Sequence, residues 1–464
     1  MILQLLPFRV PYKYLLLPVI PFLLASCNAT KYVQEDEFLL HDYRIEIDNG
    51  RVDKKELDDY IKQKPNQRIL SWRFYLSLYN LSSPEKDNGF NRWLKRIGEP
   101  PVVYDMGLRE RSAEQLKLYM RNKGYYHAQV SDTAFFRDQR ARVLFRIDAR
   151  EPFRIRDISY FFHDASLAPL VLEDTASSAV KPGDLLDVDL LEQERLRIKN
   201  ILRDSGYYHF DSDFIYFEVD SSLSGNQVDV TLGIRNFPVQ GPGGRIMHVD
   251  HPLYRIRDVY LVTEYDADRM TGNGTGHSGS LDTILYENVY VVYKDEPDIR
   301  PSVVTQKNYI MPGDLYNATD EISTYRNLSS LSAFRTVEIR FSEVGENTGL
   351  LDAEVLIVPS TRQSFTVRLE GTNSGGNIGA AGNLTYRHMN LFGRSEQFDL
   401  SFTGAIETLR ETGTSGYGNL LEFGVEGRLR IPKFLLPFRT DQFIRRFNPQ
   451  TNIRLSYNFQ QRPD

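Results

Sequence analysis

The chain contains very little cysteine: Cys27 is the single thiol among 464 residues. One thiol cannot form a disulfide within the monomer, so burial of a core must hold the fold together, and cysteine-rich metal sites are excluded. Beyond the N-terminus, no run approaches the roughly 18 continuous apolar residues of a transmembrane helix. Long basic runs are also missing, and the net charge is −6. This acidic balance argues against a nucleic-acid partner.

The N-terminal segment 1–26 predicts a signal peptide for export. Arg9 and Lys13 supply its positive charge, residues 14–24 supply an apolar stretch, and two small residues precede Cys27. The apolar stretch is shorter than the roughly 20 residues that span a bilayer as a helix. The sequence therefore indicates an exported chain without a transmembrane helix.

The four residues Leu24-Ala25-Ser26-Cys27 resemble the bacterial lipobox. This resemblance implies that Cys27 becomes the first residue of the mature chain and carries covalent diacylglycerol and acyl chains. Two or more acyl chains give lasting attachment to a membrane, whereas one gives only marginal binding. We expect no cofactor beyond these acyl chains. A buried structural cysteine is the alternative interpretation.

Internal repeats are the most informative feature of the sequence. "FRIRDISY" at Phe153 returns as "YRIRDVYL" at Tyr254, and "GYYH" occurs at Gly124 and at Gly206. "KPGDLLDVD" likewise has a second version, "MPGDLYNAT". The order of patterns predicts a unit of strand, helix, helix, strand, strand.

The second unit shows this pattern most clearly. We expect its long helix to begin with Asp189 as N-cap and Glu192 as the capping partner, and to end at Gly206 in a left-handed conformation. Alternation predicts strands over 209–219 and 227–236. The helix should bury one apolar face, formed by Val188, Leu191, Ile198 and Leu202.

These patterns divide the chain into seven segments. The predicted segments are the signal peptide 1–26, a lipidated linker 27–37, a first unit 38–152, a second unit 153–238, a linker 239–253, a third unit 254–360 and a C-terminal segment 361–464. An insertion in the third unit, "TGNGTGHSGS" from Thr271, predicts a mobile loop.

The C-terminal segment alternates strictly between apolar and polar residues. Residues 397–407, 421–431 and 453–460 each place large apolar side chains on one face and polar or charged ones on the other. This period of two is typical of transmembrane barrel strands, which face lipid and lumen in turn. A soluble antiparallel sheet with one wet face gives the same pattern. Several such strands behind an export signal favour the barrel.

Residues 365–464 have room for about five strands, whereas a single-chain bacterial barrel has at least about eight. An open sheet in lipid would leave unpaired backbone groups along two edges. We therefore expect this chain to stop inside its last domain.

Catalytic and metal-binding patterns are weak. Only "HVDH", from His248 to His251, brings metal-ligand types together, and it has no third ligand on a helix, so a solvated linker explains it better. "GPGGR" from Gly241 does not have the spacing of a phosphate-binding loop, and no serine lies in a Gly-x-Ser-x-Gly elbow. The sequence therefore predicts no catalytic residue and no metal site, and the protein is not expected to be an enzyme.

Four features together carry a family resemblance. They are "YIKQKPNQRIL", "NGFNRWLKRIGEPPVVYD", the three strand-helix-helix-strand-strand units, and the stretch from Glu370 to Phe402 with "GTNS" and "NLFG". The chain resembles the BamA/TamA family of outer-membrane assembly proteins, and within it the lipoprotein TamA-like branch of Bacteroidetes (TamL). The family's Arg-Gly-Phe or Arg-Gly-Tyr element is not found, and neither are the closing strands of its barrel.

The resemblance implies an α+β fold: tandem polypeptide-transport-associated (POTRA) domains followed by the first strands of an antiparallel transmembrane β-barrel. It implies a bacterial outer-membrane location, with a lipid anchor and with the POTRA domains in the periplasm. The implied activity is insertion and folding of outer-membrane proteins. Implied partners are unfolded outer-membrane proteins, membrane lipid and a TamB-like inner-membrane or periplasmic protein.

Two strands are candidate sites under this resemblance. One is expected to accept an incoming strand by β-augmentation, and it comprises Val228, Asp229, Val230, Thr231, Leu232, Gly233 and Ile234. The other is the expected gate strand, which comprises Phe365, Thr366, Val367, Arg368, Leu369, Glu370 and Gly371. Glycines at 371, 375, 376 and 379 fit an easily opened segment, although an ordinary turn explains them as well.

Two other functions stay open. The chain could secrete a partner protein through a pore of the same superfamily. It could also be a periplasmic lipid-anchored scaffold whose C-terminal strands form a soluble sheet. Dependence of the protein on detergent distinguishes the scaffold from the other two.

Overall fold

The computed structural model describes residues 29–49, 52–70, 72–83, 88–265, 281–294, 296–345, 348–374, 377–410, 417–435 and 448–462. The predicted lipidation residue Cys27 and the insertion at 271–280 lie outside the described residues. The chain packs as two compact bodies. The first comprises residues up to Phe161 with Ser177–Arg195 and Tyr216–Gly233, and the second comprises the rest.

The first repeat contains strands β1 (Leu39–Asp48), β2 (Gln129–Arg137) and β3 (Arg140–Asp148), with helices α2 (Lys54–Asp58), α3 (Phe74–Leu81), α4 (Gly89–Ile97) and α5 (Met106–Asn122) between β1 and β2. The strand order is β1-β3-β2, with β1 parallel and β2 antiparallel to β3. Asp138 and Gln139 join β2 to β3 with positive φ at both positions, as tight hairpins require. Helices α3 and α4 are additions to the predicted pair of helices.

The second repeat contains β4 (Arg154–Phe162), α6 (Ala168–Glu173), α7 (Val188–Asp204), β5 (Ile215–Asp220) and β6 (Gln227–Ile234), with strand order β4-β6-β5. The prediction that α7 ends at Gly206 in the left-handed region is confirmed, because its φ is 105°. The predicted N-cap is wrong. Asp187, not Asp189, caps the helix, and its Oδ1 accepts the Asp189 N–H at 2.9 Å.

The segment predicted as a linker contains most of a hairpin, β7 (Phe237–Gln240) and β8 (Ile246–Val249). His251, just after it, is 6% exposed, and its ring Nε2 lies 2.8 Å from the Arg235 carbonyl. The rings of Phe210 and Phe214 pack against it. Burial lowers the pKa of His251. The interpretation of this histidine as part of a solvated linker is therefore wrong.

The third repeat contains β9 (Arg255–Val262), β10 (Leu281–Tyr286), β11 (Val289–Lys294), α8 (Pro301–Gln306), α9 (Ala318–Ser329), β12 (Phe334–Glu343) and β13 (Leu350–Pro359). Its strand order is β10-β11-β9-β13-β12, with β9 parallel and β12 antiparallel to β13. The order β9-β13-β12 is that of the other two repeats. Strands β10 and β11, which follow the predicted insertion 271–280 in the chain, extend the sheet beyond the predicted unit.

The repeated sequence motifs meet at the joints between successive repeats. Gly124 accepts a backbone hydrogen bond from Phe153 at 2.9 Å, and Gly206 accepts the matching bond from Tyr254 at 2.9 Å. The following bonds also match, because Leu186 donates to the Phe153 carbonyl at 3.0 Å and Tyr316 donates to the Tyr254 carbonyl at 3.0 Å. Three motifs far apart in sequence therefore build one joint, which occurs twice.

The charged contacts beside these backbone bonds differ between the two joints. At the first, the Lys123 ammonium lies 3.2 Å from Asp187 and 2.7 Å from Asp189. At the second, Asp204 accepts the N–H and the hydroxyl of Thr319, both at 2.9 Å.

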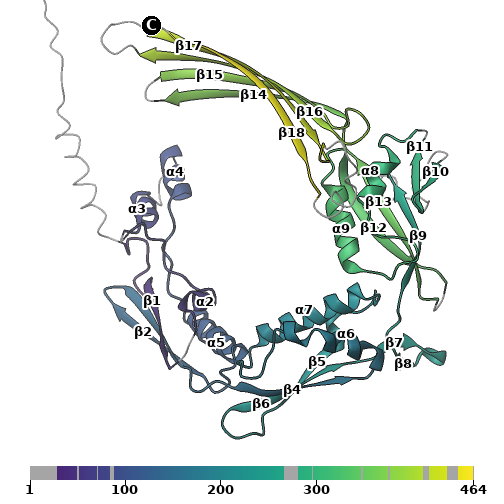
Figure 1. Ribbon diagram of the computed structural model, residues 1–464. Helices are drawn as coiled ribbons and strands as arrows, with labels where there is room; N and C mark the ends of the chain where they lie inside the picture. Colours follow the sequence, from purple (N-terminus) through teal and green to yellow (C-terminus); the bar gives the residue numbers. More distant parts are fainter. Residues whose placement is uncertain are drawn as a thin grey trace, which may run out of the picture. The chain divides into compact units, whose positions relative to one another are not determined.

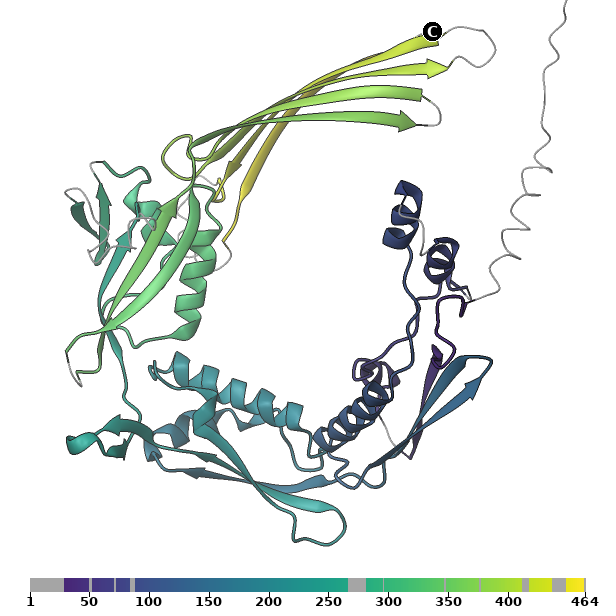
Figure 2. The same ribbon diagram turned by 180° about the vertical axis from the view of Figure 1, so that it is seen from behind.

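The C-terminal strands β14 (Gln363–Ser374), β15 (Asn377–His388), β16 (Gln397–Arg410), β17 (Tyr417–Ile431) and β18 (Thr451–Gln461) form a five-stranded antiparallel meander. Figures 1 and 2 show these long strands as one twisted sheet extending from the end of the third repeat. The predicted α+β class, with three repeats followed by about five antiparallel strands, is confirmed.

Candidate functional site

The two faces of the β14–β18 sheet differ sharply in chemistry. On one face, large apolar side chains stand in the open: Leu369 is 81% exposed, Leu455 is 80% exposed and Phe365 is 70% exposed. This apolar face also carries Val367, Leu384, Phe402, Ile406, Leu421, Phe423, Ile453, Tyr457 and Phe459. Side chains alternate across a strand, so the remaining residues form a second, polar face.

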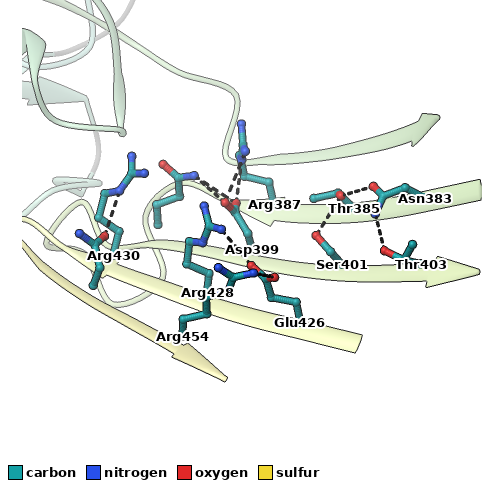
Figure 3. Close-up of polar contacts among 12 residues, drawn as sticks. Asn383, Thr385, Arg387, Asp399, Ser401, Thr403, Glu426, Arg428, Arg430 and Arg454 are labelled. Carbon is teal, nitrogen blue, oxygen red and sulfur yellow. Dashed lines mark hydrogen bonds and ion pairs between the residues drawn. The ribbon is translucent and has the colours of Figure 1, made fainter. Parts of the chain in front are cut away.

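The polar face carries several separate groups of hydrogen-bonded charged, amide and hydroxyl side chains (Figure 3). Asp399 accepts from the Arg387 Nε at 2.7 Å and from the Gln397 Nε2 at 2.9 Å. Glu426 accepts from Arg428 at 2.9 Å and from Arg454 at 2.5 Å.

Further along the same face, the Thr385 and Ser401 hydroxyls lie 3.0 Å apart, and the Asn383 amide donates to Thr403 at 2.9 Å. These side chains therefore form hydrogen bonds with one another within the polar face.

The register of the strands brings these partners together. Arg387 faces Asp399 across β15 and β16, and Asp399 faces Arg428 across β16 and β17. Arg428 faces the like-charged Arg454 across β17 and β18, and Glu426 forms a salt bridge with both. Directly opposed residues have Cβ atoms about 5 Å apart, so opposite charges there attract. A slip of one residue would reverse the two faces.

At the start of β16, polar side chains are more buried than the apolar side chain of Phe402 further along the strand. Gln397 and Asp399 on the polar face are 8% and 9% exposed, while Phe402 beside them in sequence is 39% exposed. Phe398 and Leu400 are intermediate rather than buried. Broad apolar surfaces on soluble proteins are rare and mark contact with a partner or a membrane.

The predicted gate strand lies at an edge of this sheet. Residues Phe365 to Gly371 belong to β14, which pairs with β15, and the strand order places β14 at one end of the sheet. Gly371 has open space where a side chain would stand. Gly379 does not, because a Cβ there would lie 2.6 Å from Thr372 Oγ1 and 2.9 Å from the Ile406 carbonyl. Close packing, not looseness, therefore explains Gly379.

Glycines 375 and 376 lie outside the described residues. Whether β14 opens as a gate stays a prediction, since an edge position is compatible with a gate but also with an ordinary edge strand.

The predicted acceptor strand Val228 to Ile234 has the wrong position for β-augmentation. These residues form β6, which is the central strand of its sheet, with β4 on one side and β5 on the other. Val228, Val230, Leu232 and Ile234 are each at most 1% exposed. Both edges of β6 are occupied, so the prediction is corrected: an incoming strand meets β5 or β4 first.

The "NLFG" motif acts at the junction of the sheet with the third repeat. The Asn390 side-chain amide donates to the Asp298 carbonyl at 2.7 Å, and Arg300 donates its backbone N–H to Gly393 at 2.9 Å. Ser395 accepts the Ala333 N–H at 3.0 Å. The buried Glu396 carboxylate accepts backbone N–H groups of the same loop. In the sequence this motif was part of the family resemblance, but the sequence did not show that it attaches the β14–β18 sheet to the third repeat.

A buried lysine lies at the same junction. Lys307 follows α8, is 2% exposed and donates to the Asn448 side-chain oxygen. Burial lowers the pKa of Lys307 to about 8. Among the described residues, no carboxylate forms a salt bridge with it.

Within the part of the chain that the structure describes, no group of three or more His, Cys, Asp or Glu could hold a metal ion. The described helices include none that is both long and apolar enough to cross a membrane.

Comparisons with known proteins give structural likenesses only. No family model matches the chain, and no curated protein matches it. A crystal structure of BamA POTRA domains 3–5 from Haemophilus influenzae is similar at 14% identity, covering 70% of this chain and 99% of that one, with a TM-score of 0.33. BamA from Haemophilus ducreyi lacking POTRA domains 1–3 is similar at 12% identity, covering 67% and 52%, with a TM-score of 0.34. CdiB from Acinetobacter baumannii is similar at 11% identity, covering 61% and 45%, with a TM-score of 0.26. The chain thus spans about half the length of the last two.

Proposed function

We propose that the chain is a lipid-anchored outer-membrane protein of the BamA/TamA type, in which POTRA repeats receive unfolded outer-membrane proteins and a barrel inserts them. Its implied relation to the TamL branch, its periplasmic repeats and its TamB-like partner belong to this proposal. The proposed activity is non-covalent and needs no catalytic residue. Acyl chains on Cys27 would hold the N-terminus at the membrane.

One observation carries the proposal: among the described residues, the β14–β18 sheet has one exposed apolar face and one face of hydrogen-bonded polar and charged groups. Lipid covers the outer face of a transmembrane barrel, while its inner face holds polar and charged groups in water. A scaffold with a soluble sheet would need another layer of protein on the apolar face. The three repeats with one strand order add support, because a tandem of such units offers several edge strands.

The mechanism follows from the positions of edge strands. An extended client segment would add to β5 in the second repeat, since main-chain hydrogen bonds need no fixed side-chain sequence. At the membrane, the edge strand β14 would pair with a client strand, with Phe365 to Gly371 supplying its backbone groups. Side chains on the polar face would stay solvated while the client strand is added.

The test is depletion of the complete gene product in its bacterial host. We expect several outer-membrane barrel proteins to fall in abundance together. Loss of one secreted protein with normal barrel proteins would instead favour the secretion pore. A gene product that stays monodisperse in plain buffer after removal of its anchor would favour the scaffold and contradict the proposal.

A further inference from the structure

The first repeat contains an additional segment that contributes no strand to its sheet. Residues 69–98 contain α3 and α4, which interrupt the path from β1 to α5, and we call this segment the α3–α4 appendage. In Figures 1 and 2 the two helices lie together, off the end of the β1-β3-β2 sheet. Gly98 makes this close contact possible, because a Cβ there would lie 2.6 Å from the Tyr79 backbone nitrogen.

Helix α4 turns apolar side chains outward. Leu94 is 3% exposed, whereas Phe90 is 65%, Trp93 is 51% and Ile97 is 40% exposed. The exposed three occupy positions i, i+3 and i+7, which share one face of a helix. The Phe90 and Trp93 rings stack with their centroids 5.9 Å apart. Other exposed apolar side chains of the appendage are Ile69, Leu70, Trp72 and Leu81.

The other side of α4 is basic. Arg92, Lys95 and Arg96 are exposed, and the helix contains no acidic residue. Residues 69–98 hold five Lys and Arg against two Asp and Glu, a net charge of +3 in a chain whose total is −6. Exposed aromatics with flanking basic residues are typical of helices that lie in the interface of an anionic bilayer.

The start of the described chain is tied to the same appendage. The Lys31 ammonium donates to the Asn80 carbonyl at 2.6 Å, and the Tyr32 ring packs edge-on to Tyr79. Ala29 packs with Val33 and Leu76 at the base of α3. In the chain, the expected lipidation residue Cys27 comes only two positions before Ala29.

We propose that the α3–α4 appendage is a second membrane contact, in which α4 lies in the headgroup region of an anionic lipid surface. Phe90, Trp93 and Ile97 would enter the acyl boundary, and Lys95 and Arg96 would meet lipid phosphates. This inference rests on the proposed function, because a membrane must lie within reach of residue 27. The occupant is lipid rather than a protein, since exposed aromatic and basic groups are combined on one short helix, in a repeat that follows the expected acyl anchor directly in the chain.

The chain supplies its own probe, because its only two tryptophans, Trp72 and Trp93, both lie in the appendage. The full chain with Trp72→Phe leaves Trp93 as the single reporter. It is reconstituted into vesicles of phosphatidylglycerol and phosphatidylcholine with brominated acyl chains, and into neutral brominated phosphatidylcholine vesicles. We expect a blue-shifted and quenched Trp93 emission in the anionic vesicles, with weaker quenching in the neutral ones or in high salt.

A charge variant sharpens the test. Each basic residue near an anionic surface strengthens binding about five-fold. The Lys95→Gln, Arg96→Gln double variant should therefore weaken the binding of α4 to anionic vesicles, as reported by Trp93 quenching, by about 25-fold. The matched control is Lys117→Gln with Arg121→Gln on α5 of the same repeat, where both residues are exposed. The control should behave like the parent chain.

Three outcomes would overturn the inference. Unquenched Trp93 emission in a chain that stays bound to vesicles would reject the contact and leave the proposed membrane sheet standing. Equal quenching in anionic and neutral vesicles, and equal quenching in the parent chain and the double variant, would reject the electrostatic contact. An emission shift that appears without lipid and grows with protein concentration would assign the surface to a second copy of the chain.

Discussion

Gly98 fixes the distance between α3 and α4. The backbone of Gly98 is not in the left-handed region, so an alanine there would cause no backbone strain. The alanine would instead clash with α3, because its Cβ would lie 2.6 Å from Tyr79 N and 2.8 Å from Tyr79 Cα. We expect Gly98→Ala to destabilise the appendage by about 1–3 kcal/mol, as overpacking does. Gly89→Ala at the start of the same helix meets nothing within 4 Å and should be neutral or slightly stabilising. Urea unfolding followed by tryptophan emission compares the two, and equal effects would contradict the contact.

Lys307 gives a pH-dependent prediction at the residue scale. Burial holds its pKa at about 8 in the fold, below the ordinary lysine value of 10.5. Between these values the unfolded chain binds more protons than the folded one, so the free energy of unfolding should rise from pH 8 to pH 10.5. Lys307→Met should increase the free energy of unfolding by about 3 kcal/mol at pH 7 and remove its rise with pH. Thermal unfolding across pH tests it, and a variant less stable than the parent would show that the ammonium is stabilising.

At the scale of elements, β5 and β6 of the second repeat should behave differently. β6 has a neighbour on both sides, whereas β5 has β6 on one side. In hydrogen exchange, β6 amides should be the slower set, because edge strands open with less free energy. An added client peptide in extended form should protect amides of β5 and leave those of β6 unchanged. Protection gained first in β6 would contradict the reassigned acceptor edge.

Local patterns predicted the elements better than their arrangement. Alternation predicted β16, β17 and β18, because lipid-facing and polar residues alternate with period two. The β10–β11 hairpin was missed because its turn, Glu287-Asn288, has positive φ without a glycine to signal it. The central place of β6 could not be predicted, since strand order depends on pairing between distant segments. Asp189, with Glu192 three residues later, fits the capping rule better than Asp187, and only the fold shows that Asp187 is the cap.

The candidate site was predicted in part for the same reasons. The two faces of the C-terminal sheet follow from the sequence, since each strand carries its own alternation. The pairing of Arg387 with Asp399 does not follow, because it needs the register between β15 and β16. The exposed face of α4 also needed the structure, since Phe90, Trp93, Leu94 and Ile97 share an apolar stripe that sequence alone would assign to a core.

At the scale of the whole molecule, the account depends on what covers the apolar face of the β14–β18 sheet. Lipid there makes the protein a membrane protein with three repeats outside the bilayer, whereas protein there makes it a lipid-anchored scaffold. Leu455 and Ser456 are neighbours on β18 that belong to opposite faces. Cys27→Ser removes the single native thiol, so each position can carry one labelled cysteine.

The most direct measurement places an environment-sensitive fluorophore on Leu455→Cys and, separately, on Ser456→Cys, in the complete protein reconstituted into vesicles. We expect brominated lipids to quench the label at 455 and a water-soluble quencher to reach the label at 456. The same alternation should recur at Phe402→Cys and Ser401→Cys on β16. Labels at 455 and 402 that neither quencher reaches would place this face inside protein and contradict the account.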